Sequence, residues 1–216
     1  MRTKASKPSV PPSKRPPRPR SVQSHEVRII GGQWKRSKLK VADKPGLRPT
    51  PDRVRETLFN WLGQDLSGLR CLDAFAGTGA LGLEAASRGA TEVVLVEQDA
   101  ALVAQLEKTR AQLGATGVRV QRGDGVAAIR QGHGYDLIFI DPPFDAPLFE
   151  PALKGCAAAI APTGWIYLEA PQRWSDAQLA DLGLVLYRHL RAGAVHAHLL
   201  QRAPVISEPA TLEPAA

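Results

Sequence analysis

Four residues that follow an apolar segment could do chemistry on a planar amine. Asp141, Pro142, Pro143 and Phe144 come directly after residues 135–140, whose sequence YDLIFI predicts a buried strand. The two prolines restrict the backbone and hold the loop rigid. The carboxylate and a proline carbonyl can accept hydrogens from the exocyclic amine of a nucleobase, and the aromatic ring can stack on that base. The segment therefore suits a reaction at an amine whose lone pair is otherwise delocalised into the ring.

This tetrad resembles a motif of the amino-methyltransferases, which carry Asp or Asn, two prolines and an aromatic residue. In that interpretation the Asp141 carboxylate and the Pro142 carbonyl favour the pyramidal amine, so that its lone pair faces the methyl donor. Most of the rate then comes from alignment and fixed acceptors. The plain alternative is an ordinary Asp-Pro-Pro turn that leaves Phe144 in the core.

A glycine-rich loop is the second candidate site. Residues 77–82 (GTGALG) match G-x-G-x-x-G, which is a weak signal alone. Gly77 and Gly79 let the backbone turn tightly beside a ligand, and the following helix N-terminus can face a polar group. Gly82 is better explained by packing of the helix on the sheet. Glu97, at the end of the next strand, can accept ribose hydroxyls in either NAD or S-adenosylmethionine.

Two further carboxylates favour S-adenosylmethionine over NAD. Asp73 ends the strand before the glycine loop, where it suits the positively charged amino-acid end of S-adenosylmethionine and would repel a pyrophosphate. Asp124 follows the third strand of the unit and can reach the exocyclic amine of an adenine. The alternative for Glu97 and Asp124 is a solvated residue at a strand end. No metal site is expected.

Repeated strand–helix units must position these residues. After Gly68, five apolar strands alternate with helices, which predicts a parallel sheet covered on both faces. Residues 184–190 and 195–200 are separated only by a short turn, so they predict an antiparallel hairpin at the sheet edge. The fold class is therefore α/β: a Rossmann-like, mostly parallel seven-stranded sheet with a C-terminal edge hairpin, the usual outline of class I methyltransferases.

Charge is concentrated at the N-terminus. The 216-residue chain has a formal net charge of +7, but residues 1–40 hold twelve basic groups and one acid, so the rest carries −4. Residues 1–24, rich in proline and basic residues, predict a disordered arm that either holds RNA phosphates or only solubilises the chain. Residues 25–67 predict a basic β-hairpin and a helix, residues 68–202 the main domain, and residues 203–216 a flexible tail.

Composition excludes several classes of protein. The two cysteines, Cys71 and Cys156, suit a reducing compartment and exclude a disulfide framework. No apolar stretch is long enough to cross a membrane, and the basic N-terminus lacks the apolar segment of a secretory signal. We therefore expect a cytoplasmic protein without a membrane partner.

The whole pattern resembles the RsmD-type family of small-subunit ribosomal RNA guanine-N2 methyltransferases. The matching segments are VRIIGGQWKRSKLKV, GLRPTPDRVRETLFNWL, LDAFAGTGALGLEAASRGA, VVLVE and DLIFIDPPF, in the family's order. The resemblance implies methyl transfer from S-adenosylmethionine to N2 of guanine 966 of 16S rRNA, within the small ribosomal subunit or its assembly intermediate. It is also compatible with a monomer.

The resemblance also implies site residues. Asp141, Pro142, Pro143 and Phe144 would hold the target base. The cofactor would be held by Arg48, Thr50, Asp73, Gly77, Gly79, Glu97, Gln98, Asp124 and Gly125. RNA would be contacted by Arg28, Trp34, Lys35, Arg36, Lys38, Arg53 and Arg55, although a solvated hairpin and a core tryptophan are the plain alternatives.

Three other functions stay open at this point. A DNA adenine-N6 methyltransferase or another nucleic-acid amino-methyltransferase would share the tetrad. A non-catalytic RNA-binding assembly factor would keep a vestigial site. An NAD-dependent oxidoreductase is least favoured, because no set of hydride-transfer residues accompanies the glycine loop.

Overall fold

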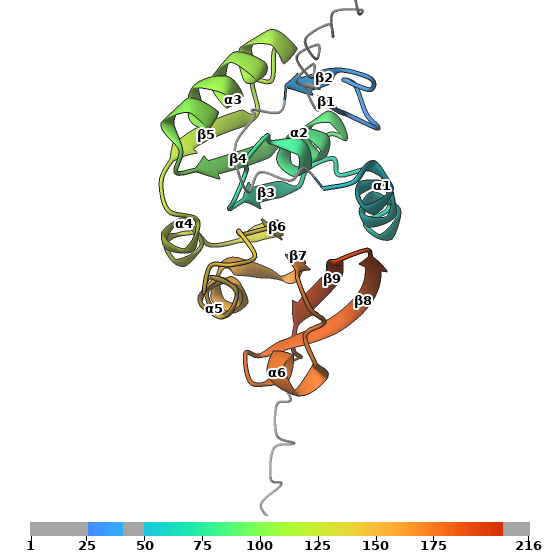
Figure 1. Ribbon diagram of the computed structural model, residues 1–216, viewed down its shortest axis with the longest axis vertical. Helices are drawn as coiled ribbons and strands as arrows, with labels where there is room; N and C mark the ends of the chain where they lie inside the picture. Colours follow the sequence, from blue (N-terminus) through green and yellow to red (C-terminus); the bar gives the residue numbers. More distant parts are fainter. Residues whose placement is uncertain (1–25, 41–49, 205–216) are drawn as a thin grey trace, which may run out of the picture.

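The computed structural model describes residues 26–40 and 50–204, and a seven-stranded sheet forms its centre (Figure 1). The strands lie in the order β5-β4-β3-β6-β7-β9-β8. Their bounds are β3 (Arg70–Asp73), β4 (Glu92–Glu97), β5 (Val118–Arg122), β6 (Tyr135–Ile140), β7 (Ile160–Ala170), β8 (Leu184–Ala192) and β9 (Val195–Arg202). Strands β3 to β7 are parallel, whereas β9 runs antiparallel to both β7 and β8. The predicted fold class and the predicted edge hairpin are confirmed.

Helices cover both faces of this sheet. One layer holds α1 (Asp52–Trp61), α2 (Ala80–Ser87) and α3 (Ala100–Leu113), and the other holds α4 (Gly125–Gln131), α5 (Phe149–Ala159) and α6 (Asp176–Ala180). The sequence of β6 is largely apolar because its side chains pack alternately into the cores on the two faces of the sheet. Leu137 and Phe139 pack in the first layer's core, and Ile138 and Ile140 pack in the second.

The pairing of the parallel strands brings residues from the carboxyl ends of several strands to one edge of the sheet. The chain runs outward from β3 through β4 to β5 and then returns to the other side of β3 as β6, so the strand order reverses between β3 and β6. Asp73 pairs with Phe139, and Ile140 pairs with Leu168 on β7. The residues that follow these pairs emerge at the carboxyl edge, where ligands of open α/β sheets bind.

A separate two-stranded sheet precedes the main one. Strands β1 (Glu26–Arg28) and β2 (Lys38–Lys40) pair antiparallel, as the basic hairpin predicted. Helix α1 follows, with Pro51 at its N-cap position and without the side-chain cap that Thr50 could have supplied. The buried residues of α1 are Val54, Arg55, Leu58 and Phe59, whereas Trp61 and Leu62 are only half-buried.

Three local features differ from the sequence pattern. Helix α6 was not expected, and it forms because Ser175 and Gln178 make a reciprocal capping box. Strand β7 begins at Ile160, earlier than the apolar run GWIYLEA indicates. Strand β8 extends two residues further into the predicted turn, and β9 extends two residues beyond its predicted C-terminal end.

Several expectations fall outside the described residues. These are the arm at 1–24, Arg48 and all but two residues of the tail at 203–216. None of the helices that the structure describes has the length and apolar character needed to cross a membrane.

Candidate active site

Asp73 lies buried at the carboxyl end of β3, only 2% exposed. Its Oδ2 accepts a hydrogen bond of 3.0 Å from the Gly82 N–H, and the backbone of Phe75 also donates to it. No basic side chain forms an ion pair with it among the described residues. The pKa of Asp73 is raised to about 7, mainly by burial and also by the charges of Glu97 and Glu169, although the two backbone donors act in the opposite direction. Within the described part of the chain, the site thus holds a buried carboxyl group without a basic partner.

The glycine loop joins β3 to α2 as the sequence predicted. Gly77 and Gly79 both have positive φ angles, 51° and 78°, a conformation that strongly favours glycine. The Gly77 N–H donates to Glu97 Oε2 at 2.9 Å, so the end of β4 holds the loop in place. A Cβ on Gly82 would lie 2.2 Å from Leu95 Cδ2, which supports the packing role expected for this residue.

The remaining predicted cofactor residues surround this loop. Glu97 is half-buried, and its Oε1 also accepts from the Asp99 N–H at 2.8 Å. Asp124 is exposed and caps α4, since its Oδ1 accepts from the Ala127 N–H at 2.7 Å. Gly125 is buried beneath it, and a Cβ there would lie 2.1 Å from the Ala74 carbonyl oxygen. Gln98 is exposed beside Glu97. These acids and backbone groups could therefore meet one ligand along the carboxyl edge.

The tetrad leaves the end of β6 at the same edge. Asp141 is partly exposed, and its carboxyl group has no hydrogen-bond or ion-pair partner in the described part of the chain. The Pro143 carbonyl accepts from the Ala146 N–H at 3.1 Å, whereas no backbone N–H of the described residues is bonded to the Pro142 carbonyl. Phe144 is 37% exposed and its ring packs against Phe149 with centroids 6.3 Å apart. The alternative that places Phe144 in the core is therefore wrong.

Sequence reasoning missed a second carboxyl group beside the tetrad. Glu169 on β7 is 3% exposed, and its Oε1 accepts from the Tyr167 hydroxyl at 2.8 Å. The Thr50 hydroxyl also hydrogen-bonds to it. A glutamate near the end of an otherwise apolar strand was the available signal, but only the register of β6 and β7 shows that it neighbours Asp141.

Asp73, Asp141 and Glu169 influence one another electrostatically. Burial raises the pKa of Asp141 well above its ordinary value, and the charges of Glu169 and Asp73 act in the same direction. Burial also raises the pKa of Glu169, against the hydrogen bonds from Thr50 and Tyr167 and the charge of Arg55. Such a cluster of acceptors favours a ligand that brings hydrogen-bond donors and positive charge.

Arg55, which the resemblance assigns to RNA contact, is not exposed on the surface of the structure. Its side chain is fully buried, where its Nη1 lies 3.4 Å from Glu84 Oε2 and its Nη2 donates to the Arg28 carbonyl at 2.9 Å. Glu84 also accepts from the backbone N–H groups of Ile30 and Gly31, at 2.7 Å each, and from Arg88. The buried charges need these partners, so Arg55 instead helps to fix the hairpin to α1 and α2.

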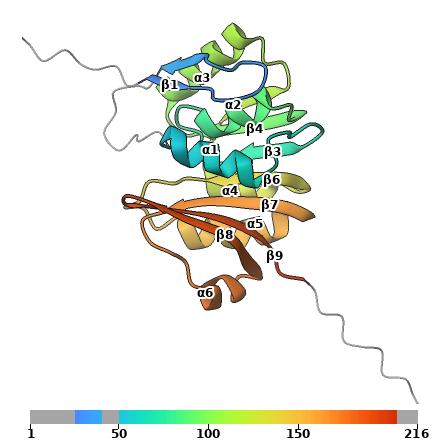
Figure 2. The ribbon, with the colours of Figure 1, turned by 90° about the vertical axis from the view of Figure 1, so that its right-hand side faces the viewer.

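The basic hairpin lies along the first helical layer (Figure 2). The Gln33 N–H donates to the Ser87 carbonyl at 2.8 Å, so the turn sits at the C-terminal end of α2, one helix length from the glycine loop. Arg28, Lys35 and Arg36 are exposed, as is Lys38, which pairs with Glu26 at 2.8 Å. Trp34 is half-buried against the core, which supports its packing alternative. Arg53 is exposed on α1.

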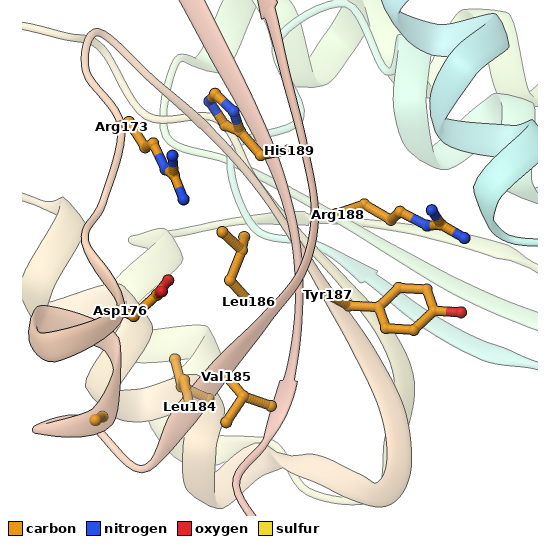
Figure 3. Close-up of a pocket in the computed structure, with 9 residues that line it drawn as sticks. Arg173, Asp176, Leu184, Val185, Leu186, Tyr187, Arg188 and His189 are labelled. Carbon is orange, nitrogen blue, oxygen red and sulfur yellow. The ribbon is translucent and has the colours of Figure 1, made fainter.

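Two hollows lie outside the group of predicted site residues at the carboxyl edge of the sheet. A hollow of 430 Å³ lies between α6 and β8, and Figure 3 shows Arg173, Asp176 and His189 around it. None of the predicted site residues lines it. Another, of 570 Å³, lies next to the tetrad loop and is lined in part by Phe149 and Trp174.

The edge hairpin and the cysteines carry no metal site. His189, His196 and His198 gather on one face of β8 and β9, where His198 is buried and accepts from the Trp174 N–H at 3.1 Å. No group of three potential ligands is arranged for a metal ion among the described residues. Both cysteines are buried and unpaired, and burial raises the pKa of the Cys71 thiol to about 12.

Comparison with known proteins gives a consistent match. The family model described as Conserved hypothetical protein 95 matches residues 27–201. Ribosomal RNA small subunit methyltransferase D of Escherichia coli (strain K12) is 42% identical over 187 residues, which cover 79% of this chain and 92% of that protein. The protein of that name from Haemophilus influenzae is 37% identical over 178 residues, covering 76% and 92%. The solved structure of the putative methyltransferase yhhF from Escherichia coli superposes with a TM-score of 0.73 at 39% identity, over 83% of this chain and 99% of that one.

Proposed function

The chain belongs to the Conserved hypothetical protein 95 family, and from that premise we propose that it is an S-adenosylmethionine-dependent methyltransferase of 16S ribosomal RNA. Its curated relatives carry the name ribosomal RNA small subunit methyltransferase D. The observation that carries the proposal is the Asp141 carboxyl group, which has no hydrogen-bond or ion-pair partner among residues 26–40 and 50–204. It lies beside an exposed Phe144, at the edge that also holds Asp73, Gly77 and Glu97.

The residues at this edge fit the proposed cofactor. S-adenosylmethionine supplies the methyl group when bound, and it offers an ammonium, two ribose hydroxyls and an adenine amine, all of which donate hydrogen bonds. Asp73 would hold the ammonium, because its carboxyl group is buried and forms no ion pair with a basic side chain of the described residues. Glu97 would accept from the ribose, and the second oxygen of Asp124 would accept from the adenine amine. Gly77 and Gly79 let the loop pass close to the ligand.

The tetrad would hold the target base. Asp141 and the Pro142 carbonyl each accept one hydrogen of the exocyclic amine, which turns the amine lone pair toward the methyl donor. Phe144 offers its exposed face for stacking, a contact worth about 1–3 kcal/mol for other stacked bases. As the methylated amine becomes cationic, Asp141 takes its proton. Alignment and fixed acceptors supply most of the rate in this scheme.

The proposed target is N2 of one guanine of 16S rRNA, at position 966. The resemblance of the hairpin and of the α1 segment to the RsmD-type family supports this position. Arg28, Lys35, Arg36 and Lys38 would contact phosphates of the same RNA. Because the hairpin turn lies beside the C-terminal end of α2, these contacts would lie at some distance from the reacting guanine.

Transfer of a labelled methyl group tests the proposal. Small subunits from a strain that lacks this methylation are incubated with tritiated S-adenosylmethionine and the full chain. The wild type is expected to label 16S rRNA, and Asp141→Ala is expected to lose most of that transfer while still binding S-adenosylhomocysteine in a thermal shift assay. Absence of labelling by the wild type, or full labelling by the variant, would contradict it.

A further inference from the structure

We propose that Glu169 selects guanine over other purines by accepting the N1–H of the target base beside the amine held at Asp141. This inference rests on the proposed transfer to guanine N2. It concerns a residue outside the tetrad and outside the glycine loop, and it gives the site a basis for choosing guanine.

The sheet register places Glu169 next to the tetrad. Ile140 pairs with Leu168 on the neighbouring parallel strand, so Asp141 and Glu169 are the next residues along β6 and β7. Phe139 and Tyr167, two residues earlier on each strand, meet edge to face with centroids 6.2 Å apart. Side chains two residues apart on a strand share a face, so both carboxyl groups continue the face of these rings toward the carboxyl edge.

The donor pattern of guanine matches two neighbouring acceptors. The Watson–Crick edge of guanine presents N1–H and the N2 amine side by side, whereas adenine presents an acceptor at N1. A carboxylate only accepts hydrogen bonds. Adjacent strands lie about 4.8 Å apart, a spacing from which two side chains can reach neighbouring N–H groups of one base. When Asp141 accepts a hydrogen bond from the amine, the neighbouring Glu169 carboxylate is placed to accept one from N1–H.

Two hydroxyl groups fix Glu169 in this position. The Tyr167 hydroxyl donates to its Oε1 at 2.8 Å, and the Thr50 hydroxyl hydrogen-bonds to the same carboxyl group. An ionised carboxylate offers about four acceptor positions, so these two bonds leave capacity for a third donor. Glu169 is only 3% exposed, and a buried acceptor discriminates strongly against a ligand that leaves it unpaired.

A substrate analogue separates recognition of N1–H from other roles of the residue. 2-Aminopurine keeps the exocyclic amine at position 2 but has an acceptor at N1 and lacks the O6 oxygen. Small subunits are reconstituted with guanine or with 2-aminopurine at the target position, and kcat/KM is measured for both. The wild type is expected to prefer guanine by about 100-fold, in line with a lost hydrogen bond to a buried charged group.

The variant Glu169→Gln gives the decisive comparison. Its amide N–H can donate to N1 of 2-aminopurine, so the preference for guanine should fall at least tenfold. A preference that arose only from O6 would survive this change. Tyr167→Phe is the companion variant: it removes one of the two hydroxyl groups that fix Glu169 but keeps the carboxylate, so it should weaken the preference for guanine less than Glu169→Gln does.

The outcomes separate this inference from the proposed function. Equal use of both bases by the wild type would overturn the role of Glu169 without needing any variant. An unchanged preference in a folded Glu169→Gln protein would overturn it as well, because a merely structural role lowers both rates alike. Failure of the wild type to methylate guanine at all would instead overturn the proposed function, and the inference with it.

Discussion

Asp73 makes the affinity for S-adenosylmethionine depend on pH in a predictable direction. Burial raises the pKa of this carboxyl group to about 7, so it is largely protonated in the free protein below that pH. The proposed ligand brings a positive charge and therefore requires the ionised form. Binding should then release a proton, and the affinity should fall as the pH is lowered through 7.

The size of the effect follows from that pKa. For one group that must ionise, the apparent Kd is multiplied by one plus the ratio of protonated to ionised carboxyl groups. With a pKa of about 7, this factor is about 2 at pH 7.0 and about 30 at pH 5.5, so the affinity should weaken about fifteenfold. An α-amino group has a pKa of about 7.7–8.0, so the ligand stays mostly protonated across this window.

Isothermal titration calorimetry measures this effect directly. Titrations at pH 5.5 and 7.0, each in two buffers that differ in ionisation enthalpy, give both the affinity and the number of protons released. The matched variant is Asp73→Asn, whose amide oxygen can still accept from the Gly82 N–H. It should bind more weakly and lose the pH dependence. A flat wild-type affinity, or an undiminished slope in the variant, would refute the reasoning.

Three further predictions concern other parts of the molecule. Phe144→Ala should lower kcat/KM by about 5- to 150-fold through lost stacking while ligand affinity stays unchanged, and a change confined to ligand affinity would contradict this role. Arg55→Met should destabilise the fold by about 3–5 kcal/mol in urea unfolding, because it leaves Glu84 with one cation fewer; a change below 1 kcal/mol would argue against that network. Lys35→Gln with Arg36→Gln should reduce the slope of log RNA affinity against log salt by about 1–2, and an unchanged slope would remove the turn from the interface.

Much of the architecture could be predicted because the central strands β4 and β6 are buried on both faces. The apolar runs of β4 and β6 and the glycine after α3 mark their elements without any long-range information. Helix α6 escaped prediction because five residues with a local capping box leave little periodic signal. The length of β7 also escaped, since residues 160–164 join the strand irregularly, across a register shift against β6.

The residues of the candidate site also differ in whether the local sequence was enough to predict them. Asp73, Glu97 and Asp141 could be placed because each directly follows or ends an apolar strand, and Gly77 because it belongs to the glycine-rich pattern after β3. Arg55 was misplaced because its partner Glu84 lies on another helix, and nothing local distinguishes a buried arginine from an exposed one. Glu169 was missed for the same reason, since its neighbour Asp141 comes from a strand about thirty residues earlier and only the register brings the two together.

The most direct test of the central claim is the identity of the methylated nucleoside. Small subunits lacking the modification are treated with S-adenosylmethionine and the full chain, and the 16S rRNA is digested and analysed by mass spectrometry. The proposed function predicts N2-methylguanosine at the single position 966, absent when Asp141→Ala replaces the wild type. Finding N6-methyladenosine, a methyl group at another position, or no methylation would contradict it.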